Sequence, residues 1–201
     1  MEININCDLG EKSKHHSNKY DPDLLGIVNS ANVACGYHAG DEETMNQVVT
    51  ISKQNGVSIG AHPSFNDPEN FGRKRLNLPT SEIAKLIIDQ INILSDVANK
   101  SGMKVTHVKP HGALYNQAAK DREISRSIGE AVLKFNPNLI MIGLFGSVML
   151  HVWQDMGLQT MEEAFGDRAY ESDGSLRNRN LDHALITNPK KAAQQAQMII
   201  N

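Results

Sequence analysis

Four separated stretches of the chain place a polar cluster directly after a short apolar run. They are residues 2–11 (EININCDLGE), 30–41 (SANVACGYHAGD), 57–63 (VSIGAHP) and 104–116 (KVTHVKPHGALYN). Parallel strands bring their carboxyl ends to one edge of a sheet or barrel, where α/β enzymes assemble active sites from residues that are distant in sequence. The four stretches therefore predict an α/β fold whose polar residues meet at one edge.

Strand-like and helix-like runs alternate along the chain, and this order predicts a parallel sheet. Three further strands are expected at 139–146, 159–165 and 183–188, which gives seven in all. The Gly/Pro/Asn-rich loop from Pro63 to Leu78 is long enough to be expected to carry function. We expect a single domain over residues 1–201.

Four helices are predicted from capping residues followed by apolar positions at helical spacing. Asp41 is expected to cap a helix that ends at Gly56, and Thr80 a helix that ends at Gly102. Asp121 is expected to open a third helix through Leu133, and Asn188 opens the last, with Pro189 at its first position.

Alternate positions are small or polar in each of the first four strands. Successive side chains of a strand point to opposite faces, so Asn6 shares a face with Asp8, and Lys109 shares a face with His111. Asn32 and His62 lie at the corresponding positions of the second and third strands. A parallel sheet covered by helices on both faces would be apolar on both. We therefore expect a distorted seven-stranded β/α barrel with a polar lumen.

The charge balance and the cysteine count narrow the functional class. The formal net charge is −3 and no Lys/Arg-rich run is present, which argues against a nucleic-acid or anionic-membrane partner. No apolar stretch is long enough to span a bilayer and the N-terminal residues do not resemble a signal peptide, so we expect a cytoplasmic protein. Cys7 and Cys35 are interpreted as buried free thiols.

Ionisable residues at the predicted strand ends are the candidates for catalysis. Asp8 and Glu11 are candidate bases or metal ligands, although Asp8 could instead cap the following turn. His62 and His111 end strands whose polar faces converge, which favours a site over two isolated structural histidines. Lys109 can hold a carboxylate or phosphate, or only form an ion pair with Asp8 or Glu163.

The remaining candidates concern metal and substrate binding. Asp8, His62 and His111 could together hold a divalent metal, but neither an HExxH helix nor a CxxC pair supports one. Arginine guanidinium groups bind the carboxylate or phosphate of a ligand through paired hydrogen bonds. The sequence has no GxxxxGK[ST] loop of the kind that binds the phosphates of a nucleotide. The residues expected to bind substrate are Asn6, Asn32, His38, Arg73, Glu163 and Arg168.

Five motifs in order resemble one known family. They are NCDLGE, SANVACGYHAGD, GAHPSFNDPENFGRK, KPHGALYN and EEAFGDRAY, and together they cover essentially the whole chain. The chain closely resembles the LamB/YcsF family. The resemblance implies a distorted β/α barrel of the glycoside hydrolase/deacetylase type. It further implies ATP-dependent opening of the 5-oxo-L-proline ring to L-glutamate, with ATP as co-substrate and the B and C subunits of a 5-oxoprolinase as partners.

The sequence departs from the family pattern in small ways and at its end. GDE at 40–42 replaces GDP, FGDR at 165–168 replaces FADR, and RK at 73–74 replaces RR. Family members usually continue beyond the region of Ile200 into another strand with a Cys-Val-His-Gly-Asp-like motif. Without that strand, the barrel is expected to be incomplete at its C-terminal side and to expose a sheet edge.

Two other functions remain open from the sequence. The first is a metal-dependent amidase or deacetylase that acts on a lactam or sugar without ATP. The second is a non-catalytic assembly subunit whose polar lumen only binds a ligand.

Overall fold

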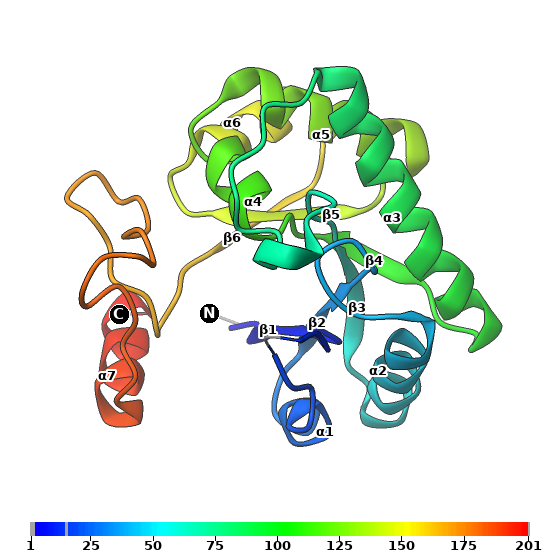
Figure 1. Cartoon of the computed structure of the whole chain (residues 1–201), viewed down its shortest axis with the longest axis horizontal. Coiled ribbons are helices and arrows are strands. Elements are labelled where there is room, and N and C mark those ends of the chain that lie inside the picture. Colours follow the sequence, from blue (N-terminus) through cyan, green and yellow to red (C-terminus); the bar gives the residue numbers. More distant parts are fainter. Residues whose placement is uncertain (1–2, 15, 201) are drawn as a thin grey trace.

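Six parallel strands follow one another around a single curled sheet in the computed structural model, which describes residues 3–14 and 16–200. Each strand pairs with the next in the chain, so β1 and β6 are the two edges and the sheet forms a half-barrel (Figure 1). The predicted α/β class, parallel order and open side are confirmed. The strands are β1 (Asn6–Leu9), β2 (Ser30–Ala34), β3 (Ser58–His62), β4 (Val105–Val108), β5 (Ile140–Leu144) and β6 (Thr160–Glu163).

Helices between successive strands cover the outer face of the sheet, and one further helix follows the last strand and lies apart from the sheet (Figure 1). They are α1 (Asp21–Leu24), α2 (Glu42–Asn55), α3 (Thr80–Lys100), α4 (Gly112–Ala118), α5 (Arg122–Phe135), α6 (Val148–Asp155) and α7 (Pro189–Ile200), with a 3₁₀ turn η1 (Pro68–Asn70) in the loop after β3.

Three of the four predicted helix caps are confirmed. Oδ1 of Asp41 accepts from the backbone N–H of Thr44 at 2.8 Å, and Oδ1 of Asp121 accepts from the N–H groups of two residues of α5. Asn188 caps α7 in the same way. The Thr80 cap is wrong, because Pro79 holds the N-cap position and Thr80 is the first helical residue.

One face of the strands carries apolar side chains and the other carries polar side chains, as the period-two alternation predicts. Val33 and Ile59 are fully buried in the apolar core between the sheet and the helices. On the inner face, the side chain of Asn32 donates to Asp8 at 2.9 Å, and Nε2 of His107 lies 3.1 Å from Oδ1 of Asn32. The inner face of the half-barrel is therefore polar.

The predicted seventh strand at 183–188 is wrong. Only an isolated antiparallel bridge between Arg168 and Leu185 occurs in this described region. His183 has a φ of 62°, a left-handed conformation that interrupts extended backbone. The segment leads instead to α7, which lies apart from the sheet in Figure 1 and has no buried residue among those described.

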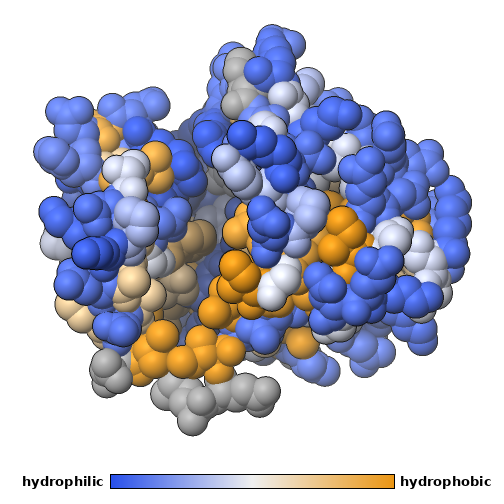
Figure 2. All heavy atoms as spheres, turned by 90° about the horizontal axis from the view of Figure 1, so that it is seen from below, coloured by the Kyte–Doolittle hydropathy of each residue, from blue (hydrophilic) through white to orange (hydrophobic). Residues whose placement is uncertain are grey.

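Cys35 is buried and Cys7 partly buried, both are free, and burial raises the pKa of each thiol to about 12. Apolar side chains gather on one face of the molecule in Figure 2, and Ile3 and Ile5 before β1 are among the exposed apolar residues. Within residues 3–14 and 16–200, no helix is long and apolar enough to cross a bilayer.

Candidate active site

The carboxyl ends of the strands bring most of the predicted site residues together around Lys109. This lysine follows β4, and its Nζ lies 3.1 Å from Oδ1 of Asp8 on β1 and 2.9 Å from Oε2 of Glu163 on β6. Nζ also donates to Oδ1 of Asn6 at 3.1 Å. Burial alone would lower the pKa of Lys109, but the charges of Asp8 and Glu163 outweigh burial and raise it. Lys109 is therefore a fixed cation that ties β4 to both edge strands.

Asp8 is the carboxylate of this group that reaches solvent. Its side chain is 34% exposed, whereas that of Glu163 is 5% exposed. Burial raises the pKa of Asp8, but the opposing charges of His62 and Lys109 prevail and hold it well below its usual value. Asp8 is consequently ionised at neutral pH, with one oxygen held by Lys109 and Asn32 and the other 3.4 Å from Nε2 of His62.

Three histidines and Glu11 form a buried cluster beside Asp8. Nδ1 of His111 lies 2.9 Å from Nε2 of His62, and Oε1 of Glu11 lies 3.1 Å from Nε2 of His38. The rings of His38 and His111 stack with their centroids 3.9 Å apart. One ligand atom from each of these four residues lies within 4.8 Å of the others, so the cluster has the composition and compactness to hold a metal ion. Asp8, which we predicted as a ligand with His62 and His111, lies next to this group.

A cavity of about 860 Å³ opens above these residues. Asp8, Glu11, His62, Lys109 and His111 line it directly, and the volume falls within the range of about 300–1,000 Å³ typical of small-molecule sites. Asn6, Asn32, His38 and Glu163 do not line the cavity but contact residues that do. Asn32 donates to Asp8, Asn6 and Glu163 contact Lys109, and His38 contacts Glu11.

Five arginines also line this cavity, and we call them the arginine group: Arg73, Arg75, Arg168, Arg177 and Arg179. Burial and the nearby positive charge of Arg179 lower the pKa of both Arg73 and Arg168. Nη2 of Arg168 donates to the carbonyl of Arg177 at 2.8 Å, while its Nε is buried without a partner among the described residues. Crowded guanidinium groups that lower one another's pKa favour an anionic ligand.

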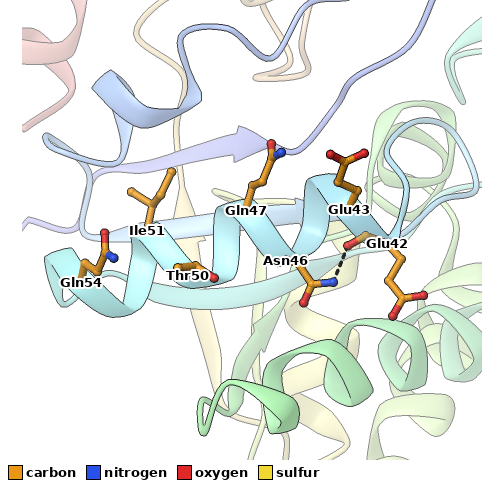
Figure 3. Close-up of a pocket in the computed structure, with 7 residues that line it drawn as sticks. All are labelled: Glu42, Glu43, Asn46, Gln47, Thr50, Ile51 and Gln54. Atoms are coloured by element: carbon orange, nitrogen blue, oxygen red, sulfur yellow. Dashed lines mark hydrogen bonds between the residues drawn. The ribbon is translucent and has the colours of Figure 1, made fainter.

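A second hollow lies along the outer face of α2 (Figure 3). The residues that line it all come from that single helix, and Figure 3 shows their side chains spread along it without converging. Within the described part of the chain, no histidine or cation lines this hollow, so we assign the site to the cavity at the strand ends.

Sequence reasoning missed some residues of the cavity. Tyr115 on α4 is buried at its wall and packs edge to face against Phe165. Behind the cavity wall, Nε2 of His107 lies 3.1 Å from Oδ1 of Asn32, a buried contact that the sequence pattern does not predict. Arg177 and Arg179 lie in a loop whose RNRN run was a visible charge signal.

Residues 3–201 match the sequence model of the LamB/YcsF family. The chain belongs to this family. It is 44% identical over 196 residues to a protein of Staphylococcus epidermidis that is named as the A subunit of 5-oxoprolinase, a match that covers 98% of this chain and 78% of the relative. A Staphylococcus carnosus protein of the same name is 42% identical over 195 residues, covering 97% of this chain and 77% of the relative.

A solved structure supports the same relationship. The lactam utilization protein from Thermus thermophilus has a TM-score of 0.91 and 38% sequence identity, covering 99% of this chain and 81% of the solved chain. The family resemblance expected from the five motifs is thus confirmed, and the motifs include Asp8, His62, Lys109 and His111.

Proposed function

We propose that this chain acts as the A subunit of a 5-oxoprolinase and opens the ring of 5-oxo-L-proline to L-glutamate, using ATP and working with B and C subunits. Relatives named as 5-oxoprolinase A subunits and a solved lactam utilization protein support the substrate class. The observation that carries the proposal is the ionised Asp8 at the cavity, held between Lys109 and His62.

An unstrained five-membered lactam is an amide and reacts poorly with water, so its carbonyl must be activated before the ring can open. ATP transfers a phosphoryl group to the amide oxygen, and water then adds to the ring carbon. The C–N bond breaks as the nitrogen takes a proton, and a second water hydrolyses the resulting acyl phosphate. One lactam, one ATP and two waters thus give glutamate, ADP and phosphate.

The cavity residues have matching roles in this scheme. Asp8 orients the water, takes its proton and returns it to the leaving nitrogen. Lys109 stabilises the negative charge that develops on oxygen, since it is a fixed cation in a largely buried setting. Asn32 and Glu163 keep these two groups in place through direct hydrogen bonds and ion pairing.

The arginine group supports the involvement of a phosphorylated ligand. Arg73 and Arg168 are suited to bind the carboxylate of oxoproline or a phosphate by paired hydrogen bonds. The sequence lacks a phosphate-binding glycine loop of the GxxxxGK[ST] type. We therefore place nucleotide binding on the partner subunits, with the phosphorylated substrate received in this cavity.

Reconstitution tests the proposal directly. The chain is mixed with B and C subunits, 5-oxoproline and ATP, and glutamate release is followed. We expect release only when all three subunits and ATP are present, and a loss of at least about 100-fold in kcat for Asp8→Asn. The matched control is Asp89→Asn on α3, where the carboxylate pairs with Lys85 outside the cavity.

Other outcomes point to other functions. Glutamate release without ATP would favour a metal-dependent amidase, a candidate that the cluster of Glu11 and three histidines supports. Full activity of Asp8→Asn in the complex would contradict a catalytic role and indicate a ligand-binding assembly subunit.

A further inference from the structure

The buried cluster beside Asp8 draws one atom from each of four separate chain segments. Glu11 follows β1, His38 follows β2, His62 ends β3 and His111 follows β4. Their exposed fractions are 7%, 0%, 1% and 5%, so each side chain is removed from water. Four independent segments thus converge on one point with nitrogen and oxygen atoms only.

The hydrogen bonds of two histidines fix which ring nitrogens carry protons. Nδ1 of His62 lies 2.7 Å from the carbonyl oxygen of Lys109, and Nε2 of His111 lies 3.0 Å from the carbonyl oxygen of Phe71. A carbonyl can only accept, so both of these nitrogens must donate a proton. In neutral rings, the remaining nitrogens of His62 and His111 therefore carry lone pairs.

Nε2 of His62 and Nδ1 of His111 face each other at 2.9 Å. Without a metal ion, a proton on Nε2 of His62 links them, and although burial lowers the pKa of His62, the charge of Asp8 outweighs burial and raises it. Two acceptors at this distance repel unless a positive charge lies between them, and either a proton or a metal ion can supply it. A shared proton links two atoms. Oε1 of Glu11 also approaches within 3.3 Å of Nδ1 of His111 and 3.9 Å of Nε2 of His62, and it meets Nε2 of His38 at 3.1 Å. Four atoms around one point are what a metal ion requires.

We propose that Glu11, His38, His62 and His111 bind one divalent transition-metal ion of the Zn²⁺ type. Bonds of about 2.1 Å in a tetrahedral site place ligand atoms about 3.4 Å apart. The four contacts just described span 2.9 to 3.9 Å, and all four ligand atoms lie within 4.8 Å of one another. Three imidazoles and one carboxylate suit Zn²⁺, whereas Mg²⁺ and Ca²⁺ prefer oxygen ligands.

The surroundings match those of bound metal ions. Histidines that bind metals usually donate their other ring N–H to a carbonyl or carboxylate, which fixes the ring and its tautomer. The carbonyls of Lys109 and Phe71 do this for His62 and His111. Glu11, His62 and His111 also line the cavity, so the ion lies where a ligand can reach it. This inference holds whether or not the chain hydrolyses a lactam.

Metal binding is measured on the isolated chain without substrate or partners, so its result is separate from that of the reconstitution. The chain is stripped with a chelator and titrated with Zn²⁺ in competition with a chromophoric chelator. We expect one ion per chain and a loss of affinity of at least about 100-fold in Glu11→Gln and His111→Ala. Co²⁺ in place of Zn²⁺ is expected to give the intense visible absorption of a tetrahedral site.

The matched control is His151→Ala, which removes an exposed histidine of α6 outside the cluster and is expected to bind Zn²⁺ as the unaltered chain does. Glu11→Gln keeps the shape of the side chain, so it and the Co²⁺ spectrum decide the question if His111→Ala fails to fold. The absence of stoichiometric Zn²⁺ binding, or an affinity that neither cluster variant changes, would overturn the proposal.

Discussion

Lys109 neutralises two carboxylates that the fold places close together. Asp8 and Glu163 come from opposite edges of the half-barrel, and both lie within 3.1 Å of its Nζ. Removing one member of a buried ionic group leaves the remaining charges buried without a partner. The free energy lost in this way is larger than the net free energy that the intact group contributes to folding. We therefore expect this side chain to stabilise the fold in addition to the catalytic role proposed for it.

Lys109→Met keeps the length of the side chain and removes its charge. We expect the free energy of unfolding to fall by about 3–5 kcal/mol, because Glu163 stays buried without a cation. Urea unfolding measures this change. Lys85→Met on the exposed face of α3 is the control and is expected to leave the free energy of unfolding nearly unchanged, because solvent screens an exposed ion pair. Equal effects in the two variants would show that Lys109 does not compensate these carboxylates.

His107 makes stability depend on pH in a defined window. Burial, with the charges of Lys109 and His62, lowers its pKa to about 3, below the value of about 6.5 in an unfolded chain. The folded chain therefore binds fewer protons than the unfolded chain between these values. The stabilisation is fully present above about pH 6.5 and is lost as the pH falls toward 3.

His107→Asn removes this titration. Urea unfolding at pH 7, 6 and 5 is expected to show a shallower fall in stability for the variant than for the unaltered chain. His151→Asn, which replaces an exposed histidine, is expected to follow the unaltered chain. If His107→Asn gives the same slope as the unaltered chain, His107 does not titrate as a buried neutral ring.

At the scale of single elements, α2 and α6 allow the contribution of an N-cap hydrogen bond to the free energy of unfolding to be measured. Asp41 caps α2 and accepts from both the backbone N–H and the hydroxyl of Thr44. Ser147 holds the same position before α6 but makes no capping hydrogen bond. Asp41→Ala is expected to lower the free energy of unfolding by about 1 kcal/mol, and Ser147→Ala to leave it nearly unchanged. Thermal or urea unfolding checks both, and a larger cost for Ser147→Ala would contradict the assignment.

The elements that the sequence predicts well are those with a repeated physical signal. The helical spacing from Ile83 to Val97 identified α3, and period-two alternation correctly assigned Asn32 and Asp8 to the polar face. The segment 183–188 failed because a short apolar run does not report backbone conformation, and His183 is left-handed. Such a conformation depends on the contacts of the whole loop.

The sequence predicts only in part which residues of the site lie next to one another. Strand ends indicated that Asp8, His62, Lys109 and His111 would meet, and the structure brings them together. The partnership of His38 with Glu11 depends on the loops after β1 and β2. No periodic pattern encodes how such loops fold back. The predicted metal set therefore contained Asp8 with His62 and His111, Glu11 was only a separate candidate ligand, and His38 was expected to bind substrate.

At the scale of the whole molecule, the cavity combines two kinds of surface. Asp8 and Glu11 belong to its acidic lining, and the arginine group supplies positive charge to the same space. The net charge of the chain is −3, so the arginines form a local positive field within an acidic protein. A localised field of this kind attracts anions and is weakened by salt.

Arg168→Gln tests whether this field recruits the anionic substrate. Because Arg168 is expected to bind the substrate carboxylate or phosphate, its loss should raise KM about 10-fold or more while kcat changes less. In the reconstituted enzyme, added salt should raise KM for the unaltered chain and do so less for the variant. Arg126→Gln on the exposed face of α5 is the control and should keep both KM and its salt dependence. A fall in kcat at constant KM would instead give Arg168 a role in the chemical step, and an unchanged KM and kcat would remove it from the site.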